Sequence, residues 1–280
     1  MNIRRHDSLS LRKARGFTLI EVLVASAVAM TMLVLLASVM NHAGMAWSAN
    51  DRQSHLREQA RQAVELIRAD LLQARLPVNP SESPGLRFVQ NPSGLGADYQ
   101  QRDSLFWQIP ARGIESVNDQ LAAVGYFVKR DGARFLLCRL YVPASNPGFK
   151  VYEDAEWIPS MIEDLAPATA AENYRGLFLE NTPGIWVQSY HRNSSGVEES
   201  YVPDSRADHT LPTRVDISIA FVAPRGMARL GGDFSADDMA ALVQEADDAK
   251  DFTDRLPEPV RKFAGHVTIS VPLAGRLYTP

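Results

Sequence analysis

Three sets of residues in this sequence have side chains that could do chemistry: a lone glutamate near the start, a cluster of carboxylates near the end, and six histidines. Glu21 is the only charged residue between Phe17 and Met40, in a segment that is otherwise mostly apolar. A charged side chain within a membrane is costly, and it is commonly retained for a function that involves a partner. Glu21 therefore calls for a partner of opposite charge.

The carboxylate cluster allows two interpretations. Its members are Asp233, Asp237, Asp238, Glu245, Asp247, Asp248, Asp251 and Asp254. Calcium is bound by carboxylate and carbonyl oxygens, so a calcium site is one interpretation. The glycine and ligand spacing of an EF-hand are absent, however, and the sequence from Ser235 to Asp238 resembles a helix cap followed by apolar residues at helical spacing. We therefore predict the solvated face of an amphipathic helix and no metal site.

The remaining reactive side chains form no catalytic or cofactor motif. The histidines include no H-E-x-x-H pair, no serine lies in a G-x-S-x-G turn, and glycine-rich phosphate-binding motifs are missing. His191 and His209 flank a polar loop, where histidines are usually solvated. Cys138, the only cysteine, excludes an intramolecular disulfide and is predicted to be buried in a strand. Three tryptophans are predicted core residues: Trp107, Trp157 and Trp186. The sequence thus predicts no enzyme, no catalytic residue and no cofactor.

The segment from Phe17 to Met40 is long enough to cross a membrane as a helix, because about 20 apolar residues suffice. Basic residues precede it, and the positive-inside rule keeps them in the cytoplasm and puts the rest of the chain on the far side. A cleaved secretory signal is the competing interpretation, since Ala25-Ser26-Ala27 has the small residues of a cleavage site. Cleavage there would leave apolar residues on the mature chain, which favours a retained span.

Charge is distributed unevenly along the chain. The formal net charge is −4, with +4 in residues 1–16 and −8 in the remainder. Nucleic-acid binding requires clustered lysine and arginine, which the acidic remainder lacks. We therefore expect no nucleic-acid partner.

The sequence Gly16-Phe17-Thr18-Leu19-Ile20-Glu21, after a basic leader and before the apolar segment, resembles the signal of type IV pilins and type II secretion pseudopilins. The resemblance implies that a prepilin peptidase cuts between Gly16 and Phe17 and methylates the new N-terminus at Phe17. It also implies that Glu21 pairs with the N-terminal amine of a neighbouring subunit during assembly. The alternative is that Glu21 lies near enough to the membrane edge to reach the interface unpaired.

Beyond the membrane the sequence predicts an α+β, pilin-like fold. Apolar residues recur in steps of three and four from Leu56 to Ala74, so one helix is expected from about Phe17 to about Arg75, ending before Pro77. Residues 77–104 are predicted to be a long loop. Antiparallel strands are predicted from the apolar runs at 104–109, 121–129 and 134–142, and a turn containing Asp131-Gly132 joins the last two. Strands with one buried face are predicted from the alternating segments at 215–221 and 267–271.

Four segments are therefore expected: a leader over 1–16, the membrane half of the helix over 17–40, its exposed half over 41–76 and a β-rich head over 77–280. Residues 176–190 and 211–217 resemble passages of J-type minor pseudopilins and W-type minor pilins. The resemblance implies a minor subunit of a type II secretion pseudopilus or type IV pilus, at the filament tip or in initiation. Implied partners are the prepilin peptidase and methyltransferase, other major and minor pilins, the inner-membrane assembly platform and membrane lipid.

The implied location is the bacterial inner membrane, crossed once, with the N-terminus in the cytoplasm and the head in the periplasm or in a filament. Two alternatives come from other classes. A membrane-anchored periplasmic binding module would never enter a filament, and a membrane-tethered enzyme would need a pocket with perturbed carboxylates or histidines.

Overall fold

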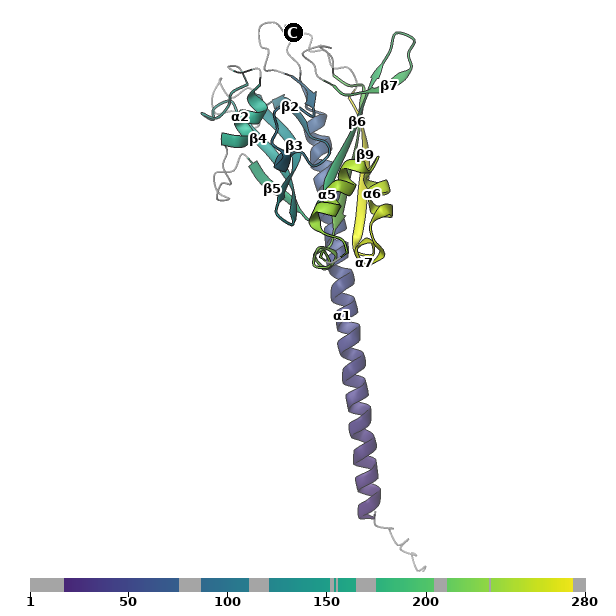
Figure 1. The fold of residues 1–280 in the computed structure, drawn as a ribbon. Helices are drawn as coiled ribbons and strands as arrows, with labels where there is room; N and C mark the ends of the chain where they lie inside the picture. Colours follow the sequence, from purple (N-terminus) through teal and green to yellow (C-terminus); the bar gives the residue numbers. More distant parts are fainter. Residues whose placement is uncertain are drawn as a thin grey trace, which may run out of the picture. The chain divides into compact units, whose positions relative to one another are not determined.

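The computed structural model describes residues 18–75, 87–110, 121–151, 154, 156–164, 175–203, 211–231 and 233–273, and for residues 42–53 and 175–178 it describes the backbone only. The chain divides into two compact units, Met1–Asp51 and Arg52–Pro280. Helices and strands carry the labels of Figure 1.

One long N-terminal helix is followed in the chain by nine strands and several short helices among the described residues. The helices are α1 (Leu19–Leu71), the 3-10 helix η2 (Ala97–Tyr99), α2 (Trp157–Asp164), α4 (Pro224–Met227), α5 (Ala236–Glu245), α6 (Ala249–Arg255) and α7 (Glu258–Arg261). The strands are β1 (Val89–Gln90), β2 (Leu105–Pro110), β3 (Leu121–Asp131), β4 (Arg134–Pro143), β5 (Arg175–Glu180), β6 (Gly184–Arg192), β7 (Glu198–Tyr201), β8 (Arg214–Val222) and β9 (Ala264–Pro272).

The part of α1 in the second unit buries one face. Its buried residues follow the predicted helical steps: Ala60, Ala63, Val64, Ile67 and Leu71. The helix ends at Leu71, earlier than the predicted end near Arg75. The main-chain N–H groups of Gln73 and Ala74 donate to carbonyls three residues back instead of four, and Arg75 then turns toward strand β2. The main-chain N–H of Arg75 donates to the carbonyl of Gln108 at 3.1 Å. The α1 backbone is helical through Gly44, so Gly44 does not interrupt it.

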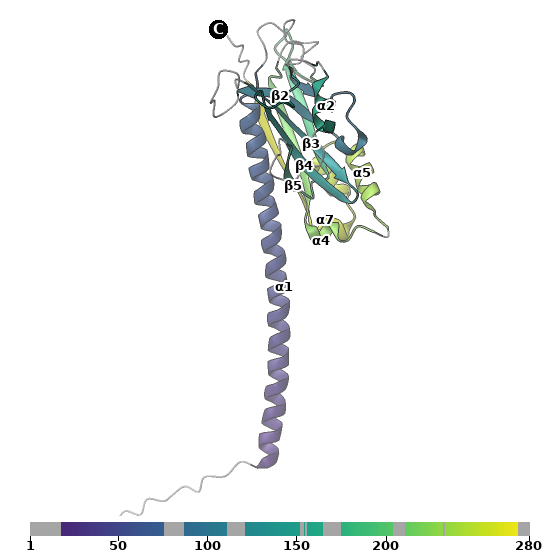
Figure 2. The same cartoon turned by 90° about the vertical axis from the view of Figure 1, so that its left-hand side faces the viewer.

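One sheet has the strand order β1-β2-β3-β4-β5, and all its pairs are antiparallel (Figure 2). The predicted hairpin is confirmed, because Asp131 pairs with Arg134 across a turn in which Gly132 has φ of +61°. Alternate side chains point to opposite faces of a strand. One face carries Trp107 and Tyr126 and packs with α1, whereas the other carries Phe106 and packs with Trp157 of α2.

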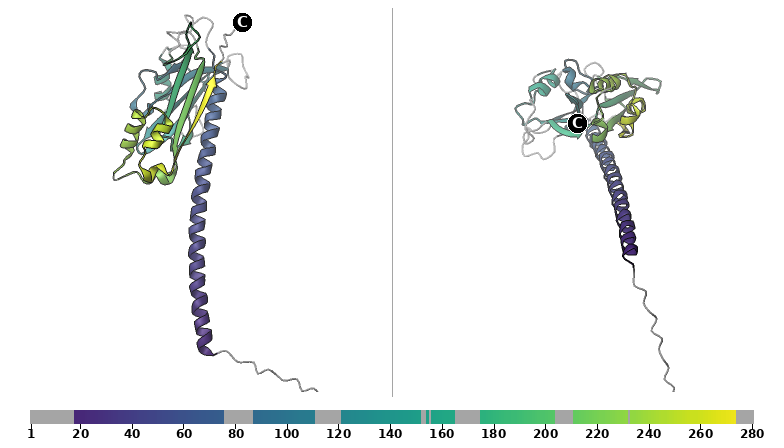
Figure 3. Two further views of the ribbon diagram at one scale, coloured as in Figure 1. Left: turned by 90° about the vertical axis from the view of Figure 1, so that its right-hand side faces the viewer. Right: turned by 60° about the horizontal axis from the view of Figure 1, so that its bottom comes forward.

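The second sheet has the order β7-β6-β8-β9, also antiparallel. Helix α6 packs on β8 and β9. Figure 3 shows the short helices α5 to α7, in yellow-green, beside the strands of this sheet. The prediction of one buried face for β8 is wrong from Ser218 onward. Ser218 and Ala220 are buried as well as Ile217 and Ile219, because α6 covers the face that was predicted to be polar.

The predicted long loop at 77–104 is also wrong in its described part, 87–104. It contains β1 and η2, and Phe88 and Val89 are buried in the core. Gln90 joins the two sheets, because its amide nitrogen donates to the carbonyl of Val187 at 2.8 Å and its amide oxygen accepts from the hydroxyl of Ser189 at 3.0 Å. The segment is ordered by these contacts with β6, which a local sequence pattern does not contain.

Candidate functional site

Helix α1 begins with a hydrogen-bonded cap that includes Glu21. The carboxylate Oε2 of Glu21 accepts from the main-chain N–H of Thr18 at 2.9 Å and from the Thr18 hydroxyl at 3.0 Å. In return, the N–H of Glu21 donates to the Thr18 hydroxyl at 3.3 Å. This is the reciprocal geometry of a capping box, with threonine as the N-cap and glutamate three residues later.

The cap adds a role for Glu21 that the sequence analysis missed. A Thr-x-x-Glu sequence before an apolar run is the usual signal for a capping box, and residues 18–21 have it. Gly16 and Phe17, the two other predicted site residues, lie outside the described residues. Glu21 is therefore the one predicted site residue whose surroundings the structure describes.

The apolar part of α1 has the length and composition of a membrane span from Leu19 to Asn41. It contains 23 residues with a mean hydropathy of 2.5. Two hydroxyls in this span bond to their own helix, since Ser26 donates to the carbonyl of Leu23 at 2.9 Å and Thr31 donates to that of Ala27 at 2.8 Å. Polar groups in hydrocarbon need such internal partners. The large apolar side chains of this span, from Leu19 to Met40, are exposed.

The acidic segment forms two capped helices. Ser235 and Asp238 make a second capping box at the start of α5, and hydrogen bonds from Ser235 hold the pKa of the Asp238 carboxyl below its usual value. Asp248 caps α6, and Asp254 pairs with Lys250 at 3.0 Å. The predicted helix-capping sequence is thus confirmed. Among the described residues, no three or more histidine, cysteine or carboxylate side chains gather as metal ligands would.

The other residues considered for chemistry have structural surroundings. Cys138 is buried, and so are the three tryptophans predicted to lie in the core. Trp186 donates to the carbonyl of Ala246 at 3.0 Å, which ties β6 to the end of α5. The ring of His191 contacts that of Tyr201 edge-on at 4.8 Å between centroids. His209, at the other end of the polar loop, lies outside the described residues.

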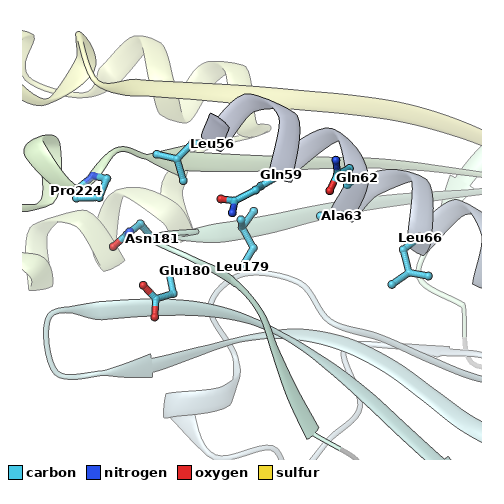
Figure 4. Close-up of a pocket in the computed structure, with 9 residues that line it drawn as sticks. All are labelled: Leu56, Gln59, Gln62, Ala63, Leu66, Leu179, Glu180, Asn181 and Pro224. Carbon is cyan, nitrogen blue, oxygen red and sulfur yellow. The ribbon is translucent and has the colours of Figure 1, made fainter. Parts of the chain in front are cut away.

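A groove of about 590 Å³ runs beside α1 in the second unit. Figure 4 shows Leu56, Gln59 and Leu66 of α1 along it, facing Leu179 and Glu180 at the end of β5. Among the described lining residues, Glu180 is the only ionisable one. An acid and base pair or a nucleophile with its base would require more such groups.

Residues 11–37 match the family model for the prokaryotic N-terminal methylation motif. The chain therefore carries the N-terminal signal of type IV pilin-like proteins. The motif implies that this pilin-like protein is processed by a prepilin peptidase and assembles with other pilins, as a membrane-anchored structural subunit and not an enzyme. Its long apolar helix followed by antiparallel sheets has the predicted α+β class.

Comparison with other known proteins adds two findings. No curated protein matches the pilin-like chain in sequence. Among solved structures, a type IV-like pilin from Thermus thermophilus matches with 9% sequence identity and a TM-score of 0.33, over 78% of this chain and 96% of that one.

Proposed function

We propose that this pilin-like chain is a minor subunit of a type II secretion pseudopilus or type IV pilus. The observation that supports the proposal is the methylation motif at residues 11–37, which contains both Glu21 and the Gly16-Phe17 junction. On this proposal residues 1–16 are a cytoplasmic leader and 17–40 span the inner membrane once. Residues 41–76 continue the helix, and 77–280 form the head on the periplasmic side.

Processing converts Phe17 into the first residue of the mature chain. The peptidase cuts after Gly16 and the same enzyme methylates the new amine of Phe17. That amine is a cation at neutral pH, and a carboxylate in a low-dielectric environment gains strongly from such a partner. Glu21 of one subunit then pairs with the Phe17 amine of its neighbour as the subunit leaves the membrane lipid.

The capping box is compatible with this pairing. Both bonds from Thr18 reach Oε2 of Glu21, and within the described residues Oε1 accepts no hydrogen bond. A carboxylate offers about four acceptor positions on its two oxygens. Glu21 can therefore cap its own helix and accept a bond from a neighbouring amine at the same time.

A place at the tip or in initiation of the filament is the finer part of the proposal. The passages that resemble J-type minor pseudopilins and W-type minor pilins lie on β5, β6 and the start of β8. A large head suits a subunit that is added once and not stacked many times. The inner-membrane assembly platform and the other minor subunits are the partners that this role requires.

The experiment that tests the proposal is intact-mass and N-terminal analysis of the protein extracted from membranes. Cells with and without the prepilin peptidase are compared, together with a Gly16→Val variant. The expected mature chain begins at methylated Phe17 in cells with the peptidase. The full-length chain is expected without it and in the variant, because a branched side chain replaces the cleavage-site glycine.

Gly44→Val is the matched control, since it makes the same change in a helix position outside the motif, and it should be processed as the unmodified chain is. A mature chain that begins at Met1 would contradict the proposal and favour the anchored binding module. One that begins beyond Met40 would favour a secreted protein.

A further inference from the structure

The short helices α4 and α7 lie together at one end of the second unit (Figure 2). The main-chain N–H of Ala223, just before α4, donates to the carbonyl of Phe263, just after α7, at 2.7 Å. Four exposed basic residues lie on these helices or directly after them: Arg225, Arg229, Arg261 and Lys262. We call these four residues the basic end.

The three arginines of the basic end have no carboxylate partner among the described residues. Arg229 lies over the ring of Phe263, with 5.0 Å from its guanidinium carbon to the ring centroid. Arg261 donates to the main-chain carbonyl of Asp254 at 3.3 Å. Arg225 makes neither an ion pair nor a hydrogen bond with the part of the chain that the structure describes.

Basic side chains elsewhere in the second unit commonly pair with a carboxylate. Examples are Arg130 with Asp237, Arg139 with Asp70, Arg192 with Glu198, Lys250 with Asp254 and Arg255 with Asp251. Lys262 also pairs, with Glu258 at 2.8 Å. The basic end and Glu258 together have a net charge of +3, or +2 if exposed Asp233 after α4 is counted, whereas the chain after residue 16 has −8.

The basic end belongs to the part of the second unit that α1 enters first. Pro224, the first residue of α4, lines the same groove as Leu56 of α1, and Figure 4 shows Leu66 at the opposite end of that groove. From Asn41, where the apolar span ends, to Leu56 the helix advances by 15 residues, about 22 Å. Measured along α1, the basic end is therefore nearer to the span than the end of the helix at Leu71.

This separation is small enough for contact with a membrane surface. Headgroups extend about 5–7 Å beyond the hydrocarbon core on each side, and membrane helices tilt by as much as about 40°, which lowers one side of an attached domain. The helix also tethers the head, so the effective concentration of lipid around it is high and a weak attraction suffices. An acidic face of another protein would attract the same arginines, but it is not tethered in this way.

We infer that the basic end contacts anionic phospholipid headgroups of the membrane that holds the span, in the subunit before assembly. Arginine and lysine near an anionic lipid surface are attracted to it. Met227 and Leu230, which are only partly buried, add apolar surface among the arginines. The inference rests on the proposed function in one respect, that residues 17–40 are retained as a membrane span.

The test measures how close the basic end comes to lipid headgroups, by fluorescence energy transfer on the full chain in nanodiscs. A donor dye is attached at Ala228→Cys, between Arg225 and Arg229, or in separate samples at Ser195→Cys, in the turn between β6 and β7. Buried Cys138 is changed to Ala throughout. The acceptor dye is on a lipid headgroup, and the nanodiscs contain phosphatidylcholine alone or phosphatidylcholine with anionic phosphatidylglycerol.

Transfer from Ala228→Cys should be greater with phosphatidylglycerol. The ratio of docked to free heads is expected to rise at least about tenfold, because several cations are attracted together. Salt at about 1 M should remove the difference, since the Debye length falls to about 3 Å. Transfer from Ser195→Cys should not increase, because Gly184 pairs with Ala220 near α4 and the turn lies beyond the opposite end of β6.

Removing the arginines of the basic end should abolish the dependence on lipid charge. The variant is Arg225→Gln, Arg229→Gln and Arg261→Gln together. The matched control removes three exposed arginines elsewhere, with side chains that are 48%, 68% and 62% exposed, and should keep the dependence: Arg68→Gln, Arg134→Gln and Arg192→Gln. Because all six side chains are exposed, both variants should unfold as cooperatively as the unmodified chain.

Equal transfer in the two kinds of nanodisc would overturn the inference and favour an acidic protein face as the partner. A dependence on lipid charge that survives in the basic-end variant, or that is lost in the control, would also overturn it, because charge elsewhere on the chain would then be responsible. The nanodisc experiment needs neither peptidase nor filament. Its failure is therefore distinct from failure of the proposed function, which N-terminal analysis tests.

Discussion

Tyr126 shows at the residue scale how burial and a neighbouring charge act together. Burial, and then the nearby carboxylate of Asp70, raise the pKa of the Tyr126 hydroxyl above its usual value of 10.0. Arg139 opposes this shift but does not cancel it. The hydroxyl therefore stays protonated in the folded chain at a pH where it ionises in the unfolded chain, and folding becomes linked to pH.

Folding stability should consequently fall in alkali. Above about pH 10 the unfolded chain releases a proton that the folded chain keeps, so the free energy of unfolding decreases as pH rises. The expected loss from this group is about 1 kcal/mol between about pH 10 and pH 11. Urea unfolding followed by tryptophan fluorescence measures it. Tyr126→Phe should remove this part of the pH dependence, and Tyr190→Phe, the control, should keep it.

The β3–β4 hairpin illustrates at the element scale what a local sequence determines. Ten residue pairs join these strands, and the turn between them requires a positive φ at Gly132. Glycine reaches that conformation without the steric cost that other residues incur. The sequence predicted this hairpin correctly because the turn chemistry and the apolar runs are adjacent in the chain.

Gly132→Ala should lower the free energy of unfolding by about 1–2 kcal/mol, the cost of a left-handed conformation with a Cβ atom. The side chain would meet no other atom within 4 Å, so the effect is purely conformational. Thermal or urea unfolding measures it against Ala133→Ser, which changes the next turn residue. Equal stability of the two variants would show that the turn relaxes to another conformation.

Elements that depend on distant partners were not predictable in the same way. The second buried face of β8 is due to α6, more than 25 residues later in the chain, and the order at Phe88 and Gln90 is due to contacts with β6. Glu21 was identified by its isolation in an apolar run. Its cap with Thr18 is also encoded locally, by the Thr-x-x-Glu pattern of residues 18–21.

Assembly is the property of the whole molecule, and it is where Glu21 should matter most. Replacing Glu21 by Ala removes the carboxylate that would pair with a neighbouring amine but leaves the Gly16-Phe17 junction unchanged. We expect normal processing and a decrease of about tenfold or more in incorporation into filaments, since a paired charge in low dielectric is worth at least that much.

Co-purification with sheared filaments measures incorporation, and immunoblotting of membranes measures processing. Ser26→Ala is the control, because the Ser26 hydroxyl bonds only to its own helix at Leu23 within the described residues. Incorporation of Glu21→Ala at the level of the control would favour the alternative in which Glu21 reaches the membrane interface unpaired.

The position of the α1 cap also bears on the order of events during maturation. Both residues that form it, Thr18 and Glu21, lie on the mature side of the proposed cut after Gly16. Removing the leader therefore takes away none of the hydrogen bonds between Thr18 and Glu21. The precursor and the mature subunit can share one conformation from Thr18 onward, so maturation changes the charge at the end of the chain without requiring the helix to form again.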